Sequence, residues 1–458
     1  MRYFVECTHT YNTNLNTGIQ RVVRNIVNRA LQSVGRRRVF PVVFEEGVFK
    51  VVDQAIAHPL AAAAEPAVAP APVPADRLRP LINYLRNIIA ALRQLLAALV
   101  PYPPFVHFVY APRSEWGLSR LGLAPMLLLR RRPRPAAAAL PPAAADFVRG
   151  DVLIMLDSSW HLDVWPAVLR AKQQGATVVC VNYDLIPQTH PQFCDDYLVT
   201  VFDRWMNQAA CHADAFVCIS RTVALSLRQS LAHLAPERTV PPRVSYFWLG
   251  SELDGHRAGD YVAPREELRA ACREEVPAYV YVSTIEPRKN HGYALAAFEL
   301  LWQRGIDANF VIVGRIGWRC DELIDRIRNH PQLGRRLFMF NDLCDGELSY
   351  GYDHARGLIF TSITEGFGLP IVEALQRGLP VFASDIEVFR EIAGRGVEFV
   401  SLADPKALAD ALARHIAAGA PRLAEAVSWL SWDACTAQFF ERVDNCLAMT
   451  PDASLLVS

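Results

Sequence analysis

Short apolar runs alternate along the chain with stretches in which apolar residues recur every three or four positions. The runs have the length of buried strands, and the periodic stretches have the spacing of helices that bury one face. Strands are predicted at residues 3–5, 38–52 (with a turn at 45–47), 152–156, 176–181, 215–219 and 244–248. Helices are predicted at residues 19–27, 162–172 and 196–210. This alternation predicts a parallel, doubly wound sheet, whose ligands bind beyond the carboxyl ends of the strands.

The same alternation begins again after a polar stretch, Asp254 to Pro264, which has the character of a linker. The second series of strands is predicted at residues 278–282, 309–313, 336–340, 358–361, 380–383 and 397–400. The predicted fold class is therefore α/β, with two doubly wound Rossmann-like domains that face each other across a cleft. We expect one domain at residues 1–258, a second at 259–430, and a last helix within 431–458.

A long insertion, from about residue 55 to residue 145, interrupts the first series. Its Ala/Pro tracts at 61–74 and 133–145 suit a linker or a disordered segment. A helix is predicted between them, from Pro80 to Val100. Arginines stand seven residues apart beside its apolar stripe, at Arg79, Arg86 and Arg93. Two interpretations stay open: the helix lies on an anionic membrane surface, or it packs on its own domain.

Composition excludes some classes of protein. Among 458 residues, Lys+Arg and Asp+Glu both count 47, so the formal net charge is zero, which argues against a general nucleic-acid binder. The 10 cysteines include no CxxC pair, as expected for a reduced chain without a zinc site. The segment Met1 to Glu6 lacks the apolar core of a signal peptide, so a cytoplasmic location is expected.

One strand of the second series ends in a glycine turn that leads into a helix. Pro370 occupies the first helical position, where its missing N–H would have no partner in any case. Gly366 and Gly368 remove side-chain bulk, so that backbone N–H groups can approach a ligand, and the helix dipole favours an anion. Glu365 in the turn and Glu373 inside the helix could bracket that ligand, although two surface glutamates would give the same pattern.

Two adjacent cations, Arg288 and Lys289, follow the first strand of the second series. A planar fork beside a point charge suits a pyrophosphate, although a basic pair that merely caps a strand would look the same. The glycine turn after a later strand of the same domain favours the functional interpretation. In the first series, Gly18 stands where a polar loop that begins at Thr8 meets a helix, and Asp184 follows another strand end.

These features resemble the family 4 retaining glycosyltransferases, which have the GT-B fold. Residues 282–290 look like the donor-phosphate segment of that family, and residues 365–374 are similar to its E-x7-E signature. The similarity runs in order from about Ala278 to Leu412. Residues 16–24 and 183–187 are similar to a subset of the family, often mannosyltransferases, that builds O-antigen and other bacterial polysaccharides.

The resemblance implies a role for each matching residue. Arg288 and Lys289 would bind the donor diphosphate, and Glu373 would hold the ribose hydroxyls. Glu365 would sit by the transferred sugar. Trp432, in the last predicted helix, resembles the closing helix that crosses back to the first domain.

The glycine turn would give the donor the backbone N–H groups of Gly366, Phe367 and Gly368, and Gly18 would contact the diphosphate. The chain departs from the family at two positions. Ser283-Thr284 stands where many members have Gly-Arg, which puts Thr284 at the donor and moves the phosphate arginine to Arg288. Tyr183 replaces a histidine that contacts the sugar, so Asp184 or Tyr183 must act without it.

The chain has no Asp-x-Asp motif, with which metal-dependent transferases hold Mg²⁺ or Mn²⁺ on the diphosphate. The missing motif predicts independence from metal, and the resemblance implies a retaining transferase without a cofactor. The resemblance implies a hexose donor, with GDP-mannose favoured, a glycan or undecaprenyl-linked acceptor, and peripheral contact with the inner membrane. One alternative is a catalytically silent GT-B protein that binds sugar nucleotides, against which stand the intact residues Glu365, Glu373, Arg288 and Lys289. Another is a different GT-B enzyme, such as a nucleotide-sugar epimerase or a phosphorylase, but no segment resembles the pyridoxal-phosphate site of a phosphorylase.

Overall fold

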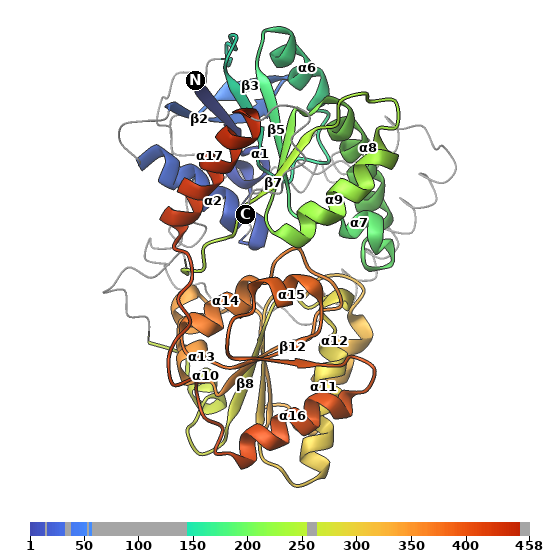
Figure 1. The fold of residues 1–458 in the computed structure, drawn as a ribbon. Coiled ribbons are helices and arrows are strands. Elements are labelled where there is room, and N and C mark those ends of the chain that lie inside the picture. Colours follow the sequence, from blue (N-terminus) through green and yellow to red (C-terminus); the bar gives the residue numbers. More distant parts are fainter. Residues whose placement is uncertain (14–15, 33–37, 53–54, 57–143, 254–262, 449–458) are drawn as a thin grey trace, which may run out of the picture. The chain divides into compact units, whose positions relative to one another are not determined.

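The computed structural model describes residues 1–13, 16–32, 38–52, 55–56, 144–253 and 263–448, all of which belong to one compact unit. These residues form one seven-stranded sheet and one six-stranded sheet, with helices packed on them (Figure 1). The predicted class, two doubly wound Rossmann-like domains, is thereby confirmed. The helix predicted at residues 80–100 and the tract at 61–74 lie outside the described residues, as does the second tract up to residue 143. The last two residues of that tract run beside β3 (Val48–Val51), where Ala145 N–H donates to the carbonyl of Phe49 at 2.7 Å.

The first sheet has the strand order β3-β2-β1-β4-β5-β6-β7. Its strands are β1 (Arg2–Glu6), β2 (Arg38–Glu45), β3 (Val48–Val51), β4 (Val152–Met155), β5 (Thr177–Asn182), β6 (Ala215–Cys218) and β7 (Arg243–Tyr246). The helices of this half are α1 (Thr8–Asn12), α2 (Gly18–Gln32), α6 (Trp165–Gln173), α7 (Ile186–Thr189), α8 (Asp196–His212) and α9 (Arg221–Leu234), with a 3₁₀ turn, η3 (Pro191–Phe193). Parallel strands buried on both faces read as continuous apolar runs, which explains why they were visible in the sequence.

The edge of the first sheet departs from the parallel pattern. Strands β2 and β3 pair antiparallel, with Glu45 opposite Val48. Glu46 and Gly47 form the turn between them with φ angles of 52° and 81°. Two residues with positive φ match the twist of a tight hairpin, so the predicted turn closes an antiparallel edge.

The polar segment after β1 was expected to be a loop, and this expectation is wrong for its first half. Residues Thr8–Asn12 form the short helix α1. The Glu6 carboxylate accepts a hydrogen bond from Thr8 N at 2.8 Å, and the Asp157 carboxylate accepts one from Thr10 N at 2.6 Å. These buried carboxylates accept hydrogen bonds from N–H groups that the start of a helix leaves without partners. Because Asp157 is distant in the sequence, the local pattern of residues does not predict this helix.

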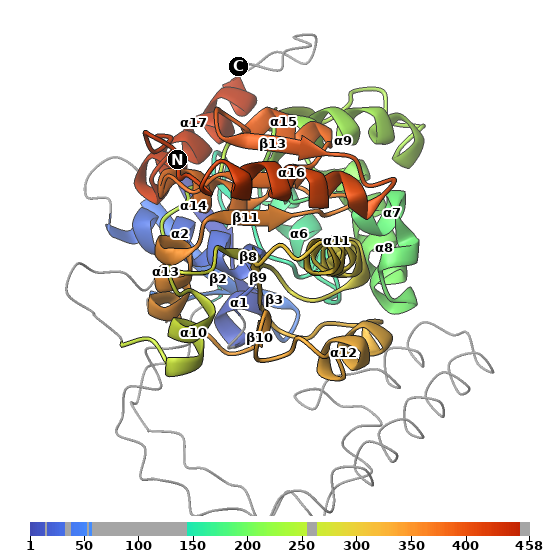
Figure 2. The ribbon, with the colours of Figure 1, turned by 90° about the horizontal axis from the view of Figure 1, so that it is seen from below.

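The second sheet has the strand order β10-β9-β8-β11-β12-β13, and all of its pairs are parallel. Its strands are β8 (Ala278–Val282), β9 (Asn309–Val313), β10 (Leu337–Phe340), β11 (Gly357–Phe360), β12 (Val381–Ser384) and β13 (Val397–Val400). The helices are α10 (Glu266–Ala271), α11 (His291–Gln303), α12 (Asp321–Arg328), α13 (Asp345–His354), α14 (Leu369–Gln376), α15 (Glu387–Ile392) and α16 (Pro405–Ala417), with a 3₁₀ turn, η4 (Pro287–Lys289). Helices α11 and α16 pack side by side (Figure 2).

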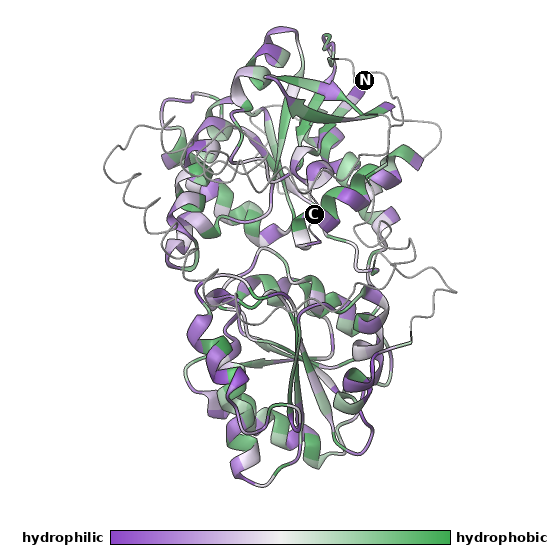
Figure 3. Cartoon of the chain, turned by 180° about the vertical axis from the view of Figure 1, so that it is seen from behind, coloured by the Kyte–Doolittle hydropathy of each residue, from purple (hydrophilic) through white to green (hydrophobic). Residues whose placement is uncertain are grey.

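Apolar residues line the strands of both sheets (Figure 3). Aromatic rings fill the centre of the second sheet, where Tyr279, Tyr281, Phe310 and Phe360 are buried. Full burial of a large apolar side chain contributes about 1.5–3 kcal/mol. The strands that carry the polar site at their carboxyl ends are therefore firmly held.

The last helix, α17 (Trp432–Ala448), packs on α2, β6 and β7, although it follows the second sheet in the sequence. Trp432 at its start is fully buried, and its indole N–H donates to the carbonyl of Glu252 at 3.0 Å. A Cβ at Gly250 would come within 2.7 Å of Trp432. Glycine at this position therefore makes room for the helix.

A carboxylate of the second half accepts hydrogen bonds from the start of a helix in the first half. Glu391 in α15 accepts hydrogen bonds from the backbone N–H groups of Arg221 and Thr222, both at 2.7 Å. It also accepts from the Thr222 hydroxyl at 2.7 Å and from the Trp248 indole at 2.9 Å. A carboxylate at a helix N-terminus satisfies orphan N–H groups and complements the dipole, so Glu391 joins α15 to α9.

A helix needs about 20 predominantly apolar residues to cross a bilayer, and no helix in the described ranges meets that requirement.

Candidate active site

The turn between β11 and α14 depends on its two glycines. Gly368 precedes α14 with φ 121°, a region that favours glycine, and a Cβ there would lie 3.0 Å from the ring of Phe389. A Cβ at Gly366 would lie 2.0 Å from the carbonyl oxygen of Tyr183. The Ser220 hydroxyl also donates to the carbonyl of Gly366 at 2.8 Å. Close approach to the first half of the chain therefore requires glycine at position 366, in addition to any role toward a ligand.

A charged cluster, which we define as Glu286, Arg288, Lys289 and Glu365, occupies the carboxyl ends of β8 and β11. The Arg288 guanidinium contacts Glu286 at 2.7 Å and Glu365 at 2.7 Å. It also donates to the carbonyl of Thr364 at 2.8 Å. The Lys289 ammonium pairs with the other oxygen of Glu365. The structure thus brings together three of the predicted catalytic residues, from turns 76 residues apart.

The side chains of the charged cluster are largely shielded from water, with exposed fractions of 16% for Arg288, 11% for Lys289 and 9% for Glu365. Burial alone would raise the pKa of Glu365, but Arg288 and Lys289 overcome this effect and lower it to about 2. Burial and the neighbouring Arg288 lower the pKa of Lys289. The pKa of Glu286 is raised by burial. Glu365 is therefore a carboxylate at neutral pH, which neutralises part of the positive charge.

Asp184, the fourth predicted catalytic residue, follows β5 in the first half of the chain. Its carboxylate accepts a hydrogen bond from the N–H of Ile186 at 2.9 Å, at the start of α7. Burial raises the pKa of Asp184. Its Cβ lies 3.2 Å from the position that a Cβ would take at Gly366, the residue that follows Glu365 of the charged cluster. The ends of two different sheets therefore contribute to one polar site, as the fold predicts.

Glu373, on α14, is also held from both halves of the chain. One carboxylate oxygen pairs with the guanidinium of Arg21 in α2. The other accepts the Tyr352 hydroxyl at 2.8 Å. The exposed fraction is 13% for the Arg21 side chain and 2% for that of Glu373.

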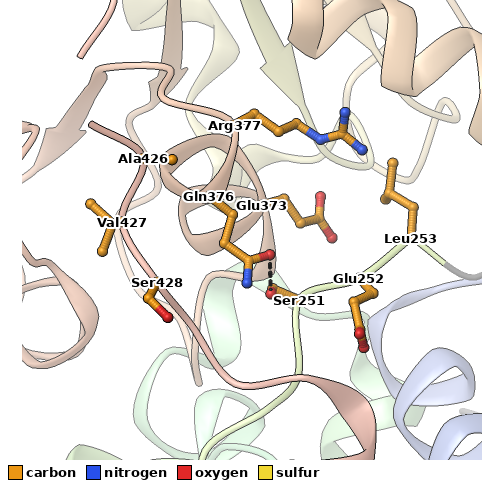
Figure 4. Close-up of a pocket in the computed structure, with 9 residues that line it drawn as sticks. All are labelled: Ser251, Glu252, Leu253, Glu373, Gln376, Arg377, Ala426, Val427 and Ser428. Atoms are coloured by element: carbon orange, nitrogen blue, oxygen red, sulfur yellow. Dashed lines mark hydrogen bonds between the residues drawn. The ribbon is translucent and has the colours of Figure 1, made fainter. Parts of the chain in front are cut away.

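A cavity of about 540 Å³ lies beside this carboxylate. Figure 4 shows Glu373 and Gln376 from α14 along it, with Arg377 just after the helix. The segment 251–253 faces them, and Ser251 donates to Gln376 at 2.6 Å. Residues 426–428 complete the lining. The volume lies within the range of small-molecule sites, which is roughly 300–1,000 Å³.

The remaining predicted donor residues occupy loops and helix starts. Gly18 begins α2, and its Cβ position is open. Thr284 is half-buried after β8, with its methyl group against Gly317. Phe367 is buried and packs edge-on against Trp429, with ring centroids 6.1 Å apart. The roles of these residues toward a donor stay predictions.

Three residues of this site received no role from the sequence. Arg21 and Tyr352 hold Glu373, and Glu286 holds Arg288. Glu286 could have been found, because it stands two residues before Arg288 in the same polar turn. Arg21 could not, because 352 residues separate it from Glu373.

In the described part of the chain, no three His, Cys, Asp or Glu residues gather where they could hold a metal ion. Independence from metal stays a prediction, to be tested in solution.

A comparison with family models matches residues 265–424 to the family described as "Glycosyl transferases group 1". This segment contains the whole charged cluster and Glu373. Among curated proteins, the chain is 35% identical over 295 residues to "Serotype-specific mannosyltransferase WbdA" of Escherichia coli. The match covers 62% of this chain and 36% of that protein. The chain thus spans about a third of the length of the curated relatives it matches first.

Solved structures share the fold at low identity. Sucrose-phosphate synthase from Thermosynechococcus elongatus superposes with a TM-score of 0.57 at 16% identity, over 98% of this chain and 100% of the other. Anabaena HepE, in complex with UDP and glucose, superposes with a TM-score of 0.53 at 13% identity, over 97% and 99% of the two chains. These similarities concern the two-sheet architecture alone.

Proposed function

We propose that this chain, which has the GT-B fold and matches the group 1 glycosyl transferase family over residues 265–424, is a glycosyltransferase. In this proposal it moves a hexose from a nucleotide-diphosphate sugar to a glycan acceptor with retention of anomeric configuration. The observation that carries this proposal is the buried charged cluster at the strand ends, beside the start of α14 and next to Asp184. Cations and the positive end of a helix together suit a diphosphate.

Lys289 is the residue we assign most directly to the diphosphate. An ammonium has three N–H donors, so it can pair with Glu365 and still donate to a phosphate oxygen. Arg288 is anchored by two carboxylates and a carbonyl, which orients its remaining N–H groups. Glu365 balances both cations and would lie by the transferred sugar.

In the proposed reaction, the bond between the anomeric carbon and the phosphate oxygen breaks, and its electron pair leaves with the nucleoside diphosphate. Positive charge develops on the sugar as an oxocarbenium-like state. Lys289 and Arg288 stabilise the negative charge that grows on the leaving group. The acceptor hydroxyl oxygen bonds to the anomeric carbon from the same face, and its proton passes to the departing phosphate oxygen. These reaction steps require no base from the protein and no metal ion.

Mannose, with GDP-mannose as the donor, is the proposed sugar because the curated relative is called a mannosyltransferase. The proposed acceptor is a growing glycan of a bacterial polysaccharide, either free or linked to undecaprenyl diphosphate. A lipid-linked acceptor would place the enzyme at the inner membrane as a peripheral protein.

The test is incubation of the purified protein with a panel of nucleotide sugars and an oligomannoside acceptor, in the presence and absence of EDTA. We expect release of GDP from GDP-mannose, and a product whose anomeric configuration, read by NMR, matches that of the donor. Inversion would contradict the mechanism, and release from another donor only would contradict mannose.

A catalytically silent binding protein would bind GDP in calorimetry and yet release none from any donor. Lys289→Met supplies the matched control, because it should abolish most of the release without unfolding the protein.

A further inference from the structure

Arg21 links the two halves of the chain at the candidate site. It lies in α2 of the first half, but its guanidinium contacts the carboxylate of Glu373 in α14. The same guanidinium donates to the carbonyl of Glu252 at 2.6 Å, at the end of the segment that leaves the first half. Arg21 is therefore held by two separate segments of the chain.

We propose that Arg21 is a positioning residue, which orients the carboxylate of Glu373 toward the donor's nucleoside. Because Arg21 belongs to α2, donor binding at Glu373 is thereby coupled to that helix. The inference rests on the proposed function, in which Glu373 accepts hydrogen bonds from the ribose hydroxyls. A carboxylate offers about four acceptor positions. Arg21 takes one oxygen and the Tyr352 hydroxyl the other, each at one position, so the carboxylate keeps acceptor capacity for a diol.

The surroundings of Glu373 favour this role over a purely structural ion pair. Glu373 is among the residues that line the cavity of about 540 Å³, a volume within the range of small-molecule sites. With Arg21 and Tyr352 fixing its two oxygens, Glu373 is pre-organised, and pre-organisation reduces the cost of binding.

The position of Arg21 within α2 adds a second argument. Gly18, which is predicted to approach the diphosphate, stands three residues earlier at the start of this 15-residue helix. Residues three apart lie on the same face of a helix. The first turn of α2 would therefore meet the diphosphate through Gly18 and the ribose carboxylate through Arg21.

The test is a double-mutant cycle in which calorimetry measures the affinity for GDP, and kinetics measure KM and kcat for GDP-mannose. Arg21→Met should weaken GDP binding about 10- to 100-fold, the size expected for a hydrogen bond to a charged group. The donor KM should rise in parallel while kcat changes less than about threefold, because a ground-state contact acts on binding. Arg21→Lys should restore part of the affinity, since it keeps the charge and loses the fork.

The decisive variant is the combination Arg21→Met with Glu373→Gln. If Arg21 acts through Glu373, the double variant should bind GDP about as weakly as Glu373→Gln alone. Arg304→Met is the matched control, because Arg304 pairs with Asp410 at 2.6 Å and neither residue lines the cavity. It should leave the GDP affinity unchanged.

Additive losses in the double variant, an unchanged affinity in Arg21→Met, or tighter binding would each overturn the inference. Tighter binding would mean that Arg21 competes with the donor for Glu373. If Arg21→Met does not fold, Arg21→Lys with and without Glu373→Gln gives the same decision. A wild-type protein that binds no nucleoside diphosphate would overturn the proposed function as well, whereas normal transfer with additive losses would overturn the inference alone.

Discussion

Replacement of Lys289 by methionine separates the chemistry of the charged cluster from its contribution to stability. The Lys289 side chain is 11% exposed, and its ammonium pairs with Glu365 and lies 5.4 Å from the ring centroid of Phe360. Methionine has a stem of similar length and packs well beside an aromatic ring. The substitution therefore removes the charge and little of the packing.

Two magnitudes follow from these contacts. Loss of one donor aimed at the charge that develops on the leaving group should reduce kcat about 10²- to 10³-fold. Glu365 keeps Arg288 at 2.7 Å, so the buried carboxylate is not left alone. The stability loss should therefore be that of one charged hydrogen bond, about 1.5–3 kcal/mol, and below the roughly 3–5 kcal/mol for a buried charge without any partner.

The assay is release of nucleoside diphosphate at saturating donor, together with urea unfolding of the same samples. The matched control is Lys172→Met, which breaks the pair with Asp214 at 2.8 Å in the first half of the chain. It should unfold at somewhat lower urea and turn over normally. A Lys289→Met enzyme with kcat within threefold of wild type would refute the assignment of Lys289 to the diphosphate.

Three further outcomes are expected. Transfer should persist in excess EDTA, and activity that is lost there and restored by Mg²⁺ or Mn²⁺ would contradict the metal-free mechanism. Gly366→Ala should lose at least tenfold in activity and melt at lower temperature, because its Cβ would lie 2.0 Å from the carbonyl of Tyr183. The control Gly351→Ala in α13, where the space is open, should keep full activity. The pKa of Glu365 is about 2, against an ordinary 4.5, so its ion pairs stabilise the folded protein at neutral pH. This contribution, on the order of 3 kcal/mol, should decrease as pH falls from about 4.5 toward 2. Glu365→Gln should remove that pH dependence from stability measured by urea unfolding.

Local patterns in the sequence predicted the two sheets because buried parallel strands are short apolar runs. Strands β8, β9 and β13 occupy the predicted residues. Helix α6 begins at Trp165, three residues later than expected, because Pro166 suits the first helical turn. Helix α1 was missed, since its N–H groups are satisfied by Glu6 and Asp157.

The candidate site was predictable where chemistry and spacing coincide. Arg288, Lys289 and Glu365 meet because parallel strands place their carboxyl ends on one edge. The partners of Glu373 were not predictable, because Arg21 comes from another domain and a single sequence does not record which surfaces meet. The requirement for glycine at position 366 was only partly predictable. A ligand site was expected there, but the close approach to the carbonyl of Tyr183, in the first half of the chain, was not.

The carboxylate that accepts hydrogen bonds from the first N–H groups of α9 belongs to Glu391, in the other half of the chain. Exchange of C-terminal halves between chains with this fold is one way to test what each half contributes, and Glu391 sets a condition on such chimeras. A transplanted half without an acceptor at this position would leave the N–H groups of Arg221 and Thr222 without their partner, along with the Trp248 indole. These groups are exposed or half-buried, so water can replace part of what is lost, but a hydrogen bond to a charged group contributes about 1.5–3 kcal/mol. Glu391 should therefore be kept in the transplanted half.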